Sequence, residues 1–446
     1  MAGHPARGEG GGQAVNRART SPPTPPEGAP ARSRAREIEG YRGLAALSTV
    51  VFHVWQQYVT YDADGSRPPV DNPYLGALIS LEVIDLFFVM SAYLLTLSYA
   101  RAAIDGGSTR PAGVFLFRRA IRIVPLYFLA VLVVWASRNP TLPGDWLDLF
   151  EHLTFTHVFD KDRIFYTLGP TWSLSLEMLF YVALVVLGPL AVRVCRAVGR
   201  RGARVAVCAG GCALLFVLPV VWIAVAHYVL HVPHTEWPVY FGPQARFGGF
   251  AAGMGLAVAT VALGERGRPG APLAGTLALT AFAGVYALSL YSEPGNAGFT
   301  FYHPIAAALW LVMLYGTVHV ARRPRWHRFL RARWLTGVGL VSYSLFIWHE
   351  PIMLRLYGAG LLPHGQEDFP LAVAVVLLVA VPAAVLSYWA VEYPASLLGR
   401  LKDRAGRPRD FYPADAADRV DPANRNGRGE ARESPARAGA ELRGTA

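Results

Sequence analysis

The sequence has little charge and little cysteine for its length. Of its 446 residues, 16% are charged and 53% are hydrophobic, whereas soluble domains carry about 25% charged residues. This shortage of charge excludes an ordinary water-soluble enzyme. The three cysteines (Cys195, Cys208 and Cys212) fit neither a disulfide framework nor the spacing of a zinc site. We therefore expect no metal and interpret the thiols as small apolar side chains.

Lysine is nearly absent as well, because only Lys161 and Lys402 stand among the 42 basic residues. Arginine therefore carries the net charge of +11. A basic chain can bind nucleic acid, but these arginines stand between long apolar runs, which indicates membrane topology, so we predict no nucleic-acid partner. The preference for arginine, together with abundant alanine, is typical of a high-GC bacterial genome.

Large apolar side chains are scarce at both ends of the chain. Residues 1–36 are rich in Gly, Pro, Ala and Arg, and residues 401–446 have a similar polar composition. Such segments bury too little apolar surface to offset the entropy of ordering them. We predict disordered cytoplasmic tails at 1–36 and 401–446 around one membrane domain at 37–400. The N-terminus lacks the apolar run of a cleavable signal peptide.

Between the tails, apolar runs long enough to cross a ~30 Å hydrocarbon layer recur. They predict an all-α integral membrane protein, multi-pass in the cell membrane, with about ten transmembrane helices in contact with the lipid bilayer. The predicted spans are 41–60, 75–99, 122–137, 172–192, 205–230, 241–263, 272–291, 301–320, 335–357 and 370–392.

The connections between these spans differ in charge. One alternating set holds 18 arginines and two acidic residues, and the opposite set holds four basic and twelve acidic residues. Because short cytoplasmic loops carry the excess of Lys and Arg, both termini are predicted to be cytoplasmic. The arginine-rich set is 101–122, 193–204, 264–270 and 321–334, and the acidic set is 60–74, 138–171, 231–240, 291–300 and 358–369.

Ionisable residues inside the predicted spans need a partner or a function, because charge is costly at membrane depth. Arg42 should lie at the cytoplasmic interface of the first span, and His53 follows ~16 Å further along the helix, near the midplane. Eleven residues make about three turns, so both side chains share one face. A packed structural histidine and a catalytic one are equally good interpretations of His53 alone.

The second span runs inward and carries Glu82 and Asp85 on one face. Counted from Tyr74, Asp85 is ~16 Å deep, level with His53. A carboxylate beside a buried imidazole fixes its tautomer and stabilises the imidazolium, as a general base requires. The alternative is a structural His–Asp hydrogen bond without chemistry.

Further polar groups are predicted in the outer half of the membrane. Glu177 should lie about two turns below the outer surface, His349 in the outer half of its span, and Arg246 at the outer entrance of the sixth span. Such a cluster implies a hydrated cavity. In contrast, we interpret His227, His231, His234 and His303, near the outer interface, as solvated surface.

On the cytoplasmic side, Arg118, Arg119 and Arg122 lead into the third span. Positive-inside topology explains most such clusters. However, Arg118 and Arg122 stack at i and i+4, where like charges repel unless an anion lies between them. A phosphorylated cofactor entering from the cytosol would supply that anion.

Over residues 37–395, the chain resembles the membrane-bound acyltransferase 3 family, whose members O-acylate sugars, surface polysaccharides and some secondary metabolites. The most specific match is Arg42 and His53 with ten residues between them. One departure is Ala92, where the family usually has glycine. The other matching segments, in order, are 87–91, 119–122, 172–177, 342–351 and 392–394.

The resemblance implies an acyl-CoA donor, with acetyl-CoA as our expectation, and His53 as the catalytic residue. The predicted acceptor is a hydroxyl of a glycan or of a small molecule such as a macrolide. Acyl chain length, the side from which the acceptor binds, direct or two-step transfer, and oligomeric state stay open. The predicted roles are catalysis for His53, Asp85 and Glu177, donor binding for Arg42, Arg118, Arg119 and Arg122, and substrate binding for Glu82, Arg246 and His349.

Two other classes of protein are considered. Buried Asp, Glu, His and Arg also mark proton-coupled transporters, although spans one to five and six to ten share no convincing repeat. A membrane scaffold or receptor would leave the predicted mid-membrane His–acid pair without a purpose. CoA-dependent transfer of label, set against uptake into vesicles, separates the enzyme from the transporter.

Overall fold

The computed structural model describes residues 30–62 and 65–404, and this part of the chain is almost entirely helical. Its strands are a short antiparallel pair, β1 (Thr60–Asp62) and β2 (Gly65–Arg67), so the prediction of an all-α protein is confirmed. Most of the predicted tails, 1–36 and 401–446, lies outside the described residues. The predicted membrane domain at 37–400 stays a prediction, and the helices at its two ends extend past it, from Pro30 and to Arg404.

The helices follow one another along the chain with short connections. The first half contains α1 (Pro30–Gln57), α2 (Pro73–Ile79), α3 (Ile84–Ile104), α4 (Ala112–Arg138), α5 (Trp146–Leu153), α6 (Trp172–Arg196), α7 (Arg201–Ala224), α8 (Trp237–Phe241) and α9 (Pro243–Leu263). The second half contains α10 (Ala271–Tyr291), α11 (Ala297–Thr300), α12 (Tyr302–Val318), α13 (His327–Leu330), α14 (Arg333–Leu340), α15 (Ser342–Gly358), α16 (Phe369–Ser387) and α17 (Tyr393–Arg404). Short 3₁₀ or π segments are η1 (His157–Phe159), η2 (Gly169–Thr171), η3 (Val225–Val229), η4 (Gly264–Gly267), η5 (Gln366–Asp368) and η6 (Tyr388–Glu392).

Seven helical stretches among the described residues are long and apolar enough to cross a membrane. They show a multi-pass membrane protein. The other three predicted spans coincide with α1, the shorter apolar helix α12 and the pair α14–α15, and the count of ten stays a prediction. The seven are 73–104, 112–138, 169–196, 201–229, 237–267, 271–291 and 366–398.

Two predicted spans are broken in the structure. The span predicted at 75–99 divides into α2 and α3, which are separated by four residues that end at Val83. The span predicted at 335–357 divides at Val341 into α14 and α15. These breaks shift the depth of the side chains that follow them, which affects the candidate site.

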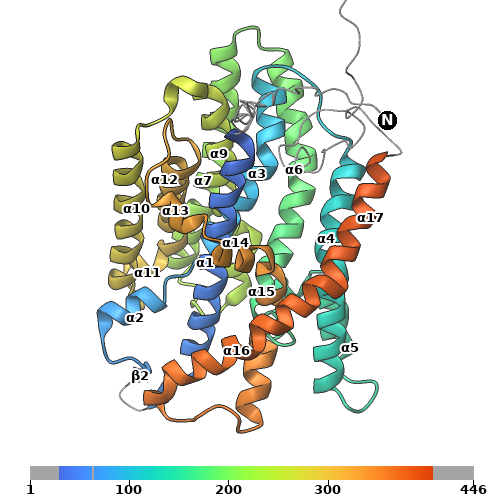
Figure 1. Cartoon of the computed structure of the whole chain (residues 1–446), viewed down its shortest axis with the longest axis vertical. Coiled ribbons are helices and arrows are strands. Elements are labelled where there is room, and N and C mark those ends of the chain that lie inside the picture. The colour runs from blue at the N-terminus through green and yellow to red at the C-terminus, as the bar shows by residue number, and fades with distance from the viewer. Residues whose placement is uncertain (1–29, 63–64, 405–446) are drawn as a thin grey trace, which may run out of the picture.

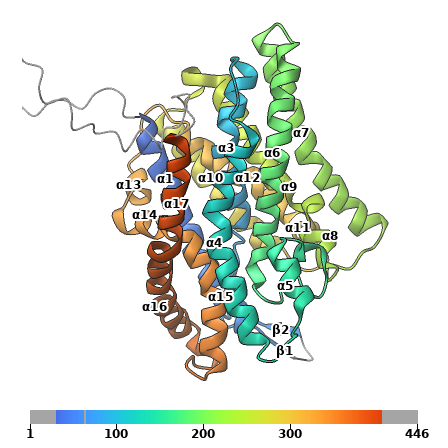
Figure 2. The ribbon, with the colours of Figure 1, turned by 90° about the vertical axis from the view of Figure 1, so that its right-hand side faces the viewer.

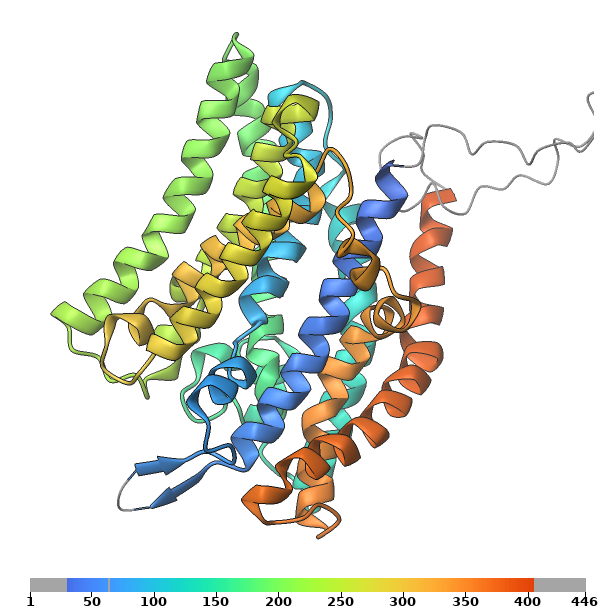
Figure 3. The same ribbon diagram turned by 60° about the vertical axis from the view of Figure 1, so that its left-hand side comes forward.

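The helices form one elongated bundle around α1. The first helix runs through the middle of the bundle, from the end where α17 finishes to the end that carries the β1–β2 hairpin (Figure 1). From the side, α5, α8 and the hairpin gather toward this same end (Figure 2). The helix α7 forms one flank of the molecule, and α16 with α17 forms the opposite flank (Figure 3).

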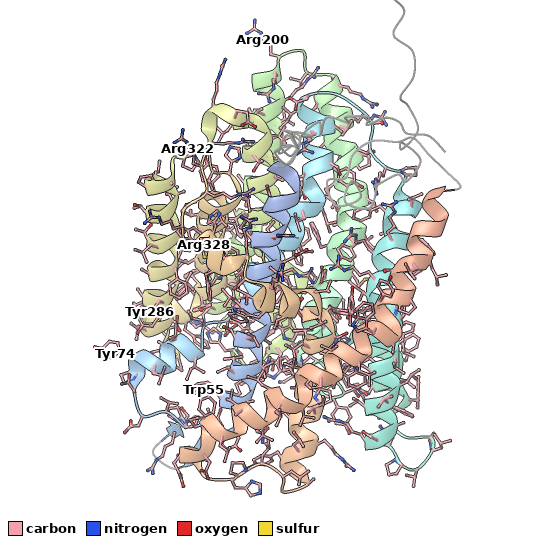
Figure 4. All side chains as sticks on the ribbon, in the orientation of Figure 1. Trp55, Tyr74, Arg200, Tyr286, Arg322 and Arg328 are labelled. Carbon is pink, nitrogen blue, oxygen red and sulfur yellow. The ribbon has the colours of Figure 1, made fainter. Side chains whose placement is uncertain are left out.

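The two ends of the bundle carry different side chains. Arg200 and Arg322, from two of the arginine-rich connections, lie toward one end, whereas Trp55 and Tyr74 lie toward the other (Figure 4). The end with the arginines is also the end at which α1 begins and α17 finishes (Figure 1). We name these the cytoplasmic end and the outer end, after the orientation predicted from the loops.

Glycines allow α1 and α3 to pack closely against neighbouring helices. A Cβ on Gly253 of α9 would lie 2.3 Å from the carbonyl oxygen of Val89 on α3. A Cβ on Gly339 of α14 would lie 2.0 Å from the carbonyl oxygen of Glu39 on α1. Backbones approach this closely only where one partner has no side chain, so α1 and α3 are each held against a neighbour at a fixed depth.

Candidate active site

A cavity of about 410 Å³ lies beside His53 in the outer half of the bundle. Aromatic rings make up much of its wall, with a few polar groups between them, and no arginine or lysine is among its lining residues. Concave sites with apolar walls and a few polar groups are typical of small-molecule binding. The rings are Phe52, Phe165, Trp172, Trp237, Phe241 and Phe346, and the polar side chains are Thr49, His53, Gln56, Glu82 and Glu350.

The imidazole of His53 is held through its Nδ1 atom. Its Nδ1 lies 2.9 Å from the carbonyl oxygen of Thr49, one turn earlier in α1. The same Nδ1 lies 3.0 Å from Nε2 of His349 on α15. The second imidazole is fixed in turn, because its Nδ1 lies 2.8 Å from the carbonyl oxygen of Phe346.

This network determines where the protons lie. A carbonyl oxygen only accepts hydrogen bonds, so Nδ1 of His349 carries a proton and its Nε2 has a free lone pair. Nδ1 of His53 therefore donates, to Thr49 and toward His349. Nε2 of His53 is left without a proton, in the wall of the cavity. A neutral imidazole with this nitrogen free has the geometry of a general base.

The substrate-binding role predicted for His349 does not match its position. The residue is fully buried at 1% exposure and is not among the residues that line the cavity. It lies directly against His53, where its lone pair can accept the Nδ1 proton. This geometry favours an orienting role.

Asp85 does not orient His53 as predicted. Its Oδ2 lies 2.7 Å from Nδ1 of His303 on α12, and no hydrogen bond or ion pair joins Asp85 to His53 within the described part of the chain. The depth of Asp85 had been counted along one continuous helix, but the break between α2 and α3 places it in the first turn of α3. The interpretation of His303 as solvated surface is also wrong, since only 17% of its side chain is exposed.

Glu82 reaches the cavity, as a predicted substrate-binding residue should. It is among the lining residues, and 37% of its side chain is exposed. Its Oε2 lies 3.2 Å from Nε2 of His303, and its backbone N–H donates to the hydroxyl of Tyr302. His303 therefore bridges one buried and one accessible carboxylate.

Arg246 supports the wall of the cavity from behind. It is 4% exposed, and its Nε donates to the carbonyl oxygen of Tyr240 at 2.9 Å. The guanidinium lies over the rings of Phe241 and Trp172, at 4.5 and 5.3 Å from their centroids, as cations do on aromatic faces. It is not among the lining residues, so the structure separates it from direct contact with a substrate in this cavity.

Glu177, the other carboxylate with a predicted catalytic role, lies away from His53. Its Oε1 accepts hydrogen bonds from Ser91 at 2.7 Å and from Tyr181 at 2.5 Å. The carboxylate also interacts electrostatically with Arg42. The predicted position of Glu177 requires the fourth span to start at the outer surface, but Trp172 at the start of α6 already lines the cavity. Glu177 therefore lies ~7 Å further toward the cytoplasmic end.

A second group of charges lies around Arg42, which is near the middle of α1 and ~16 Å closer than His53 to the cytoplasmic end. Arg42 interacts electrostatically with Arg122 of α4, with Glu177 and with Glu392. Arg119 also contributes, because its charge acts on the Tyr181 hydroxyl that binds Glu177. The structure therefore brings together residues that are far apart in the sequence and that were predicted to bind the donor.

One arginine of this group, Arg119, has a buried donor that is left unpaired. Nε of Arg119 is buried and has no hydrogen-bond partner, and Arg122 is exposed. Buried donors are normally satisfied, and guanidinium groups pair well with phosphate. These residues, together with the half-buried Arg118 next to them, fit the phosphates of a nucleotide donor.

Two features of the cavity were not predicted from the sequence. Glu350 lines it, and its Oε2 accepts the backbone N–H of Gly169 at 2.8 Å. Phe165 and Trp237, from the predicted connections 138–171 and 231–240, also line it. A signal was present for Glu350, since it follows His349 inside a predicted span and a carboxylate there needs a partner.

Comparison with known proteins assigns the family. A family model described as an acyltransferase domain matches residues 36–389. The chain belongs to the acyltransferase 3 family, as the motifs in its sequence indicated. No solved structure matches the chain.

Three curated relatives carry names that agree with this family. A protein of Komagataeibacter xylinus named as a membrane-bound transacylase is 27% identical over 81% of this chain and 83% of its own length. A protein of Bacillus subtilis (strain 168) named as a peptidoglycan O-acetyltransferase is 26% identical over 81% of this chain and 55% of its own length. A peptidoglycan O-acetyltransferase of Listeria monocytogenes is 26% identical over 72% of this chain and 50% of its own length. The chain thus spans only about half of the last two relatives. The family and these names support O-acyltransferase activity in a membrane protein.

Proposed function

We propose that this protein transfers an acyl group, with acetyl as the expected group, from acyl-CoA to a hydroxyl of a carbohydrate or of a glycosylated secondary metabolite. His53 acts as the general base. The observation that carries this proposal is the position of His53 in the wall of an aromatic cavity, with its Nδ1 anchored by Thr49 and His349.

The donor site is proposed around Arg42, Arg118, Arg119 and Arg122, which would bind the phosphates of CoA. Arg42 and His53 lie on one face of one helix, ~16 Å apart. An extended thioester arm anchored by its phosphates near Arg42 would place the reacting carbonyl near His53. The arginines need only hold and orient the donor, and positioning alone supplies a large part of such rate enhancements.

The acceptor is proposed to bind in the aromatic cavity. Trp172 and Trp237 offer flat apolar faces for the ring of a sugar. Glu82 and Glu350 offer carboxylate oxygens that accept hydrogen bonds from hydroxyl groups. The names of the two relatives linked to peptidoglycan support a carbohydrate acceptor.

The chemistry then requires one proton to move twice. His53 Nε2 takes the proton of the acceptor hydroxyl as the oxygen attacks the thioester carbonyl. Thr49 and His349 stabilise the resulting imidazolium through Nδ1. When the tetrahedral adduct collapses, the C–S bond breaks and His53 returns the proton to the departing thiolate. The products are an ester and a free thiol, with no net change in protons.

This reaction joins opposite sides of the membrane. With ten spans and both termini in the cytoplasm, as the loop charges predict, the arginine group faces the cytosol and the cavity faces outward. The donor would therefore enter from the cytosol and the acceptor from the outer side.

The test is release of free thiol from acetyl-CoA by purified protein in detergent. The acceptors to screen are methyl glucoside, methyl N-acetylglucosaminide and a macrolide, each with and without protein. We expect thiol release that depends on one acceptor class, with acetyl found on its oxygen. No release from folded protein, together with proton-coupled uptake of the same compounds into proteoliposomes, would replace the transferase with a transporter.

A further inference from the structure

The structure assigns a function to His303 that neither the sequence motifs nor the family relation indicates. We propose that His303 is a proton-dependent positioning residue. Its protonated form holds Glu82 in place for the acceptor, and loss of that proton releases Glu82. The inference rests on the proposed function, because it takes the cavity beside His53 as the acceptor site.

The geometry is a carboxylate–imidazole–carboxylate chain that ends in the cavity. Nδ1 of His303 lies 2.7 Å from Asp85 Oδ2, and Nε2 lies 3.2 Å from Glu82 Oε2. Both carboxylates accept hydrogen bonds only. An imidazolium has two N–H groups and a positive charge, so it donates to Asp85 and forms an ion pair with Glu82. A neutral imidazole that donates to Asp85 has neither a proton nor a charge for Glu82.

Loss of the interaction with His303 costs Asp85 more free energy than it costs Glu82. The side chain of Asp85 is 2% exposed, and leaving it unpaired would leave a buried charge without a hydrogen bond. The side chain of Glu82 is 37% exposed and lines the cavity, where water can replace the imidazole. Neutral His303 therefore keeps its remaining proton on Asp85, and Glu82 is the partner that is released.

Another charged residue, Arg246, and another titratable residue, Tyr302, interact with this carboxylate–imidazole–carboxylate arrangement. Arg246 of α9 interacts electrostatically with both Asp85 and Glu82, and its Nη1 has no hydrogen-bond partner. Tyr302 precedes His303, and its hydroxyl accepts a hydrogen bond from the Glu82 backbone N–H. Arg246 therefore stabilises the two acids at every pH, and His303 supplies the charge that changes.

Release of Glu82 should weaken the binding of the acceptor. The released side chain of Glu82 would have to be ordered again before it could bind a sugar hydroxyl, which weakens the complex. His53 belongs to a separate network through Thr49 and His349, so the turnover number should not change with His303.

The experiment measures kcat and the KM of methyl glucoside against pH from 5 to 9, with saturating acetyl-CoA. We expect the wild-type KM to rise about fivefold with increasing pH, as the ion pair between His303 and Glu82 is lost. His303→Gln, which does not titrate, should show the high KM at every pH, with kcat within about twofold of the wild type at each pH. His303→Arg keeps two or more donors and a fixed charge, and it should show the low KM throughout.

Glu82→Gln is the second variant, at a partly exposed position where a folding defect is not expected. It should also give a high KM that does not change with pH. Identical pH profiles of KM in the wild type and in His303→Gln would overturn the inference while leaving the acyl transfer intact. A wild type that transfers acetyl to no alcohol would remove the proposed function, and the inference would fail with it.

Discussion

The outer and cytoplasmic parts of the bundle hold two groups of ionisable side chains that differ in chemistry. The outer group combines imidazoles and carboxylates with aromatic rings around a cavity, and no arginine or lysine lines that cavity. The cytoplasmic group gathers Arg42, Arg119 and Arg122 around the carboxylates of Glu177 and Glu392. The first group suits a neutral, hydroxyl-bearing ring, and the second suits a polyanion. Two substrates of opposite character are thus expected to enter from opposite ends.

A single helix connects the two groups. Arg42 and His53 both belong to α1, so their separation is set by helix geometry and not by loop conformation. The helix is held at a fixed depth by its glycine-mediated contact with α14. Variants in the two groups should therefore affect different kinetic constants, and this difference can be tested.

The largest effect on activity is expected for His53, the proposed general base in the outer group. His53→Ala should lower kcat by about 10²- to 10⁴-fold, because a positioned general base contributes that much. The measurement is acceptor-dependent thiol release from membranes that contain equal amounts of protein. The matched control is His231→Asn, which removes an exposed outer imidazole. Asparagine tolerates the positive φ of 51° at that position. Full activity in His53→Ala would refute the assignment of the base.

The cytoplasmic group should control the donor alone. Arg122→Ala removes one guanidinium that can pair with phosphate, so the KM of acetyl-CoA should rise about tenfold or more. The KM of the acceptor should not change. Arg200→Ala is the control, since Arg200 is exposed at the same end of the molecule (Figure 4). A rise in the acceptor KM instead would mean that the two groups are not separate sites.

His349 gives a finer test within the outer group. His349→Leu removes the lone pair that accepts the Nδ1 proton of His53, so kcat should fall about tenfold while the acceptor KM stays within about twofold. His349→Gln keeps an acceptor oxygen and should retain more of the activity. If KM rises and kcat is unchanged, His349 binds substrate, as the sequence alone had predicted.

The elements that the sequence predicted well are local ones. The spacing from Arg42 to His53 lies within one helix, and the charge of each loop is independent of tertiary structure. The pairings of imidazoles were not predictable in this way. His53 meets His349 across 296 positions of the sequence, and Asp85 meets His303 across 218. From the sequence, several outer histidines could equally have paired with Asp85. Only the packing of α3 against α12 selects His303.

The depth of side chains in the membrane was the second property that the sequence predicted wrongly. Counting 1.5 Å per residue from an assumed surface requires that the helix is continuous and starts at that surface. The span that holds Asp85 breaks before α3, and α6 starts at the level of the cavity. Glu177 and Asp85 were therefore assigned to His53 at the wrong levels. Glu82 gave a usable signal, because a carboxylate at a membrane interface needs a partner and His303 opens a helix at the same end.

The smallest predicted effect concerns the stability of the outer connection 138–171. There, His157 stacks on His152 with ring centroids 4.1 Å apart. Burial, together with the charge of His152, lowers the pKa of His157 from 6.5 to about 3. In the unfolded chain this imidazole binds a proton below pH 6.5, whereas in the folded chain it stays neutral until about pH 3.

The folded state should therefore lose stability as the pH falls below 6.5. The loss from this residue is at most about 1.4 kcal/mol per pH unit, and it ends near pH 3. His157→Asn, which does not titrate, should flatten the dependence of Tm on pH between 6.5 and 4, whatever its effect on Tm at pH 7. Only the slope is diagnostic, because the substitution also removes the ring stacking. The exposed His231→Asn serves as the comparison and should keep the wild-type slope. An unchanged slope in His157→Asn would show that this imidazole takes up its proton equally in the folded and unfolded chain, and that other groups cause the acid sensitivity of the outer end.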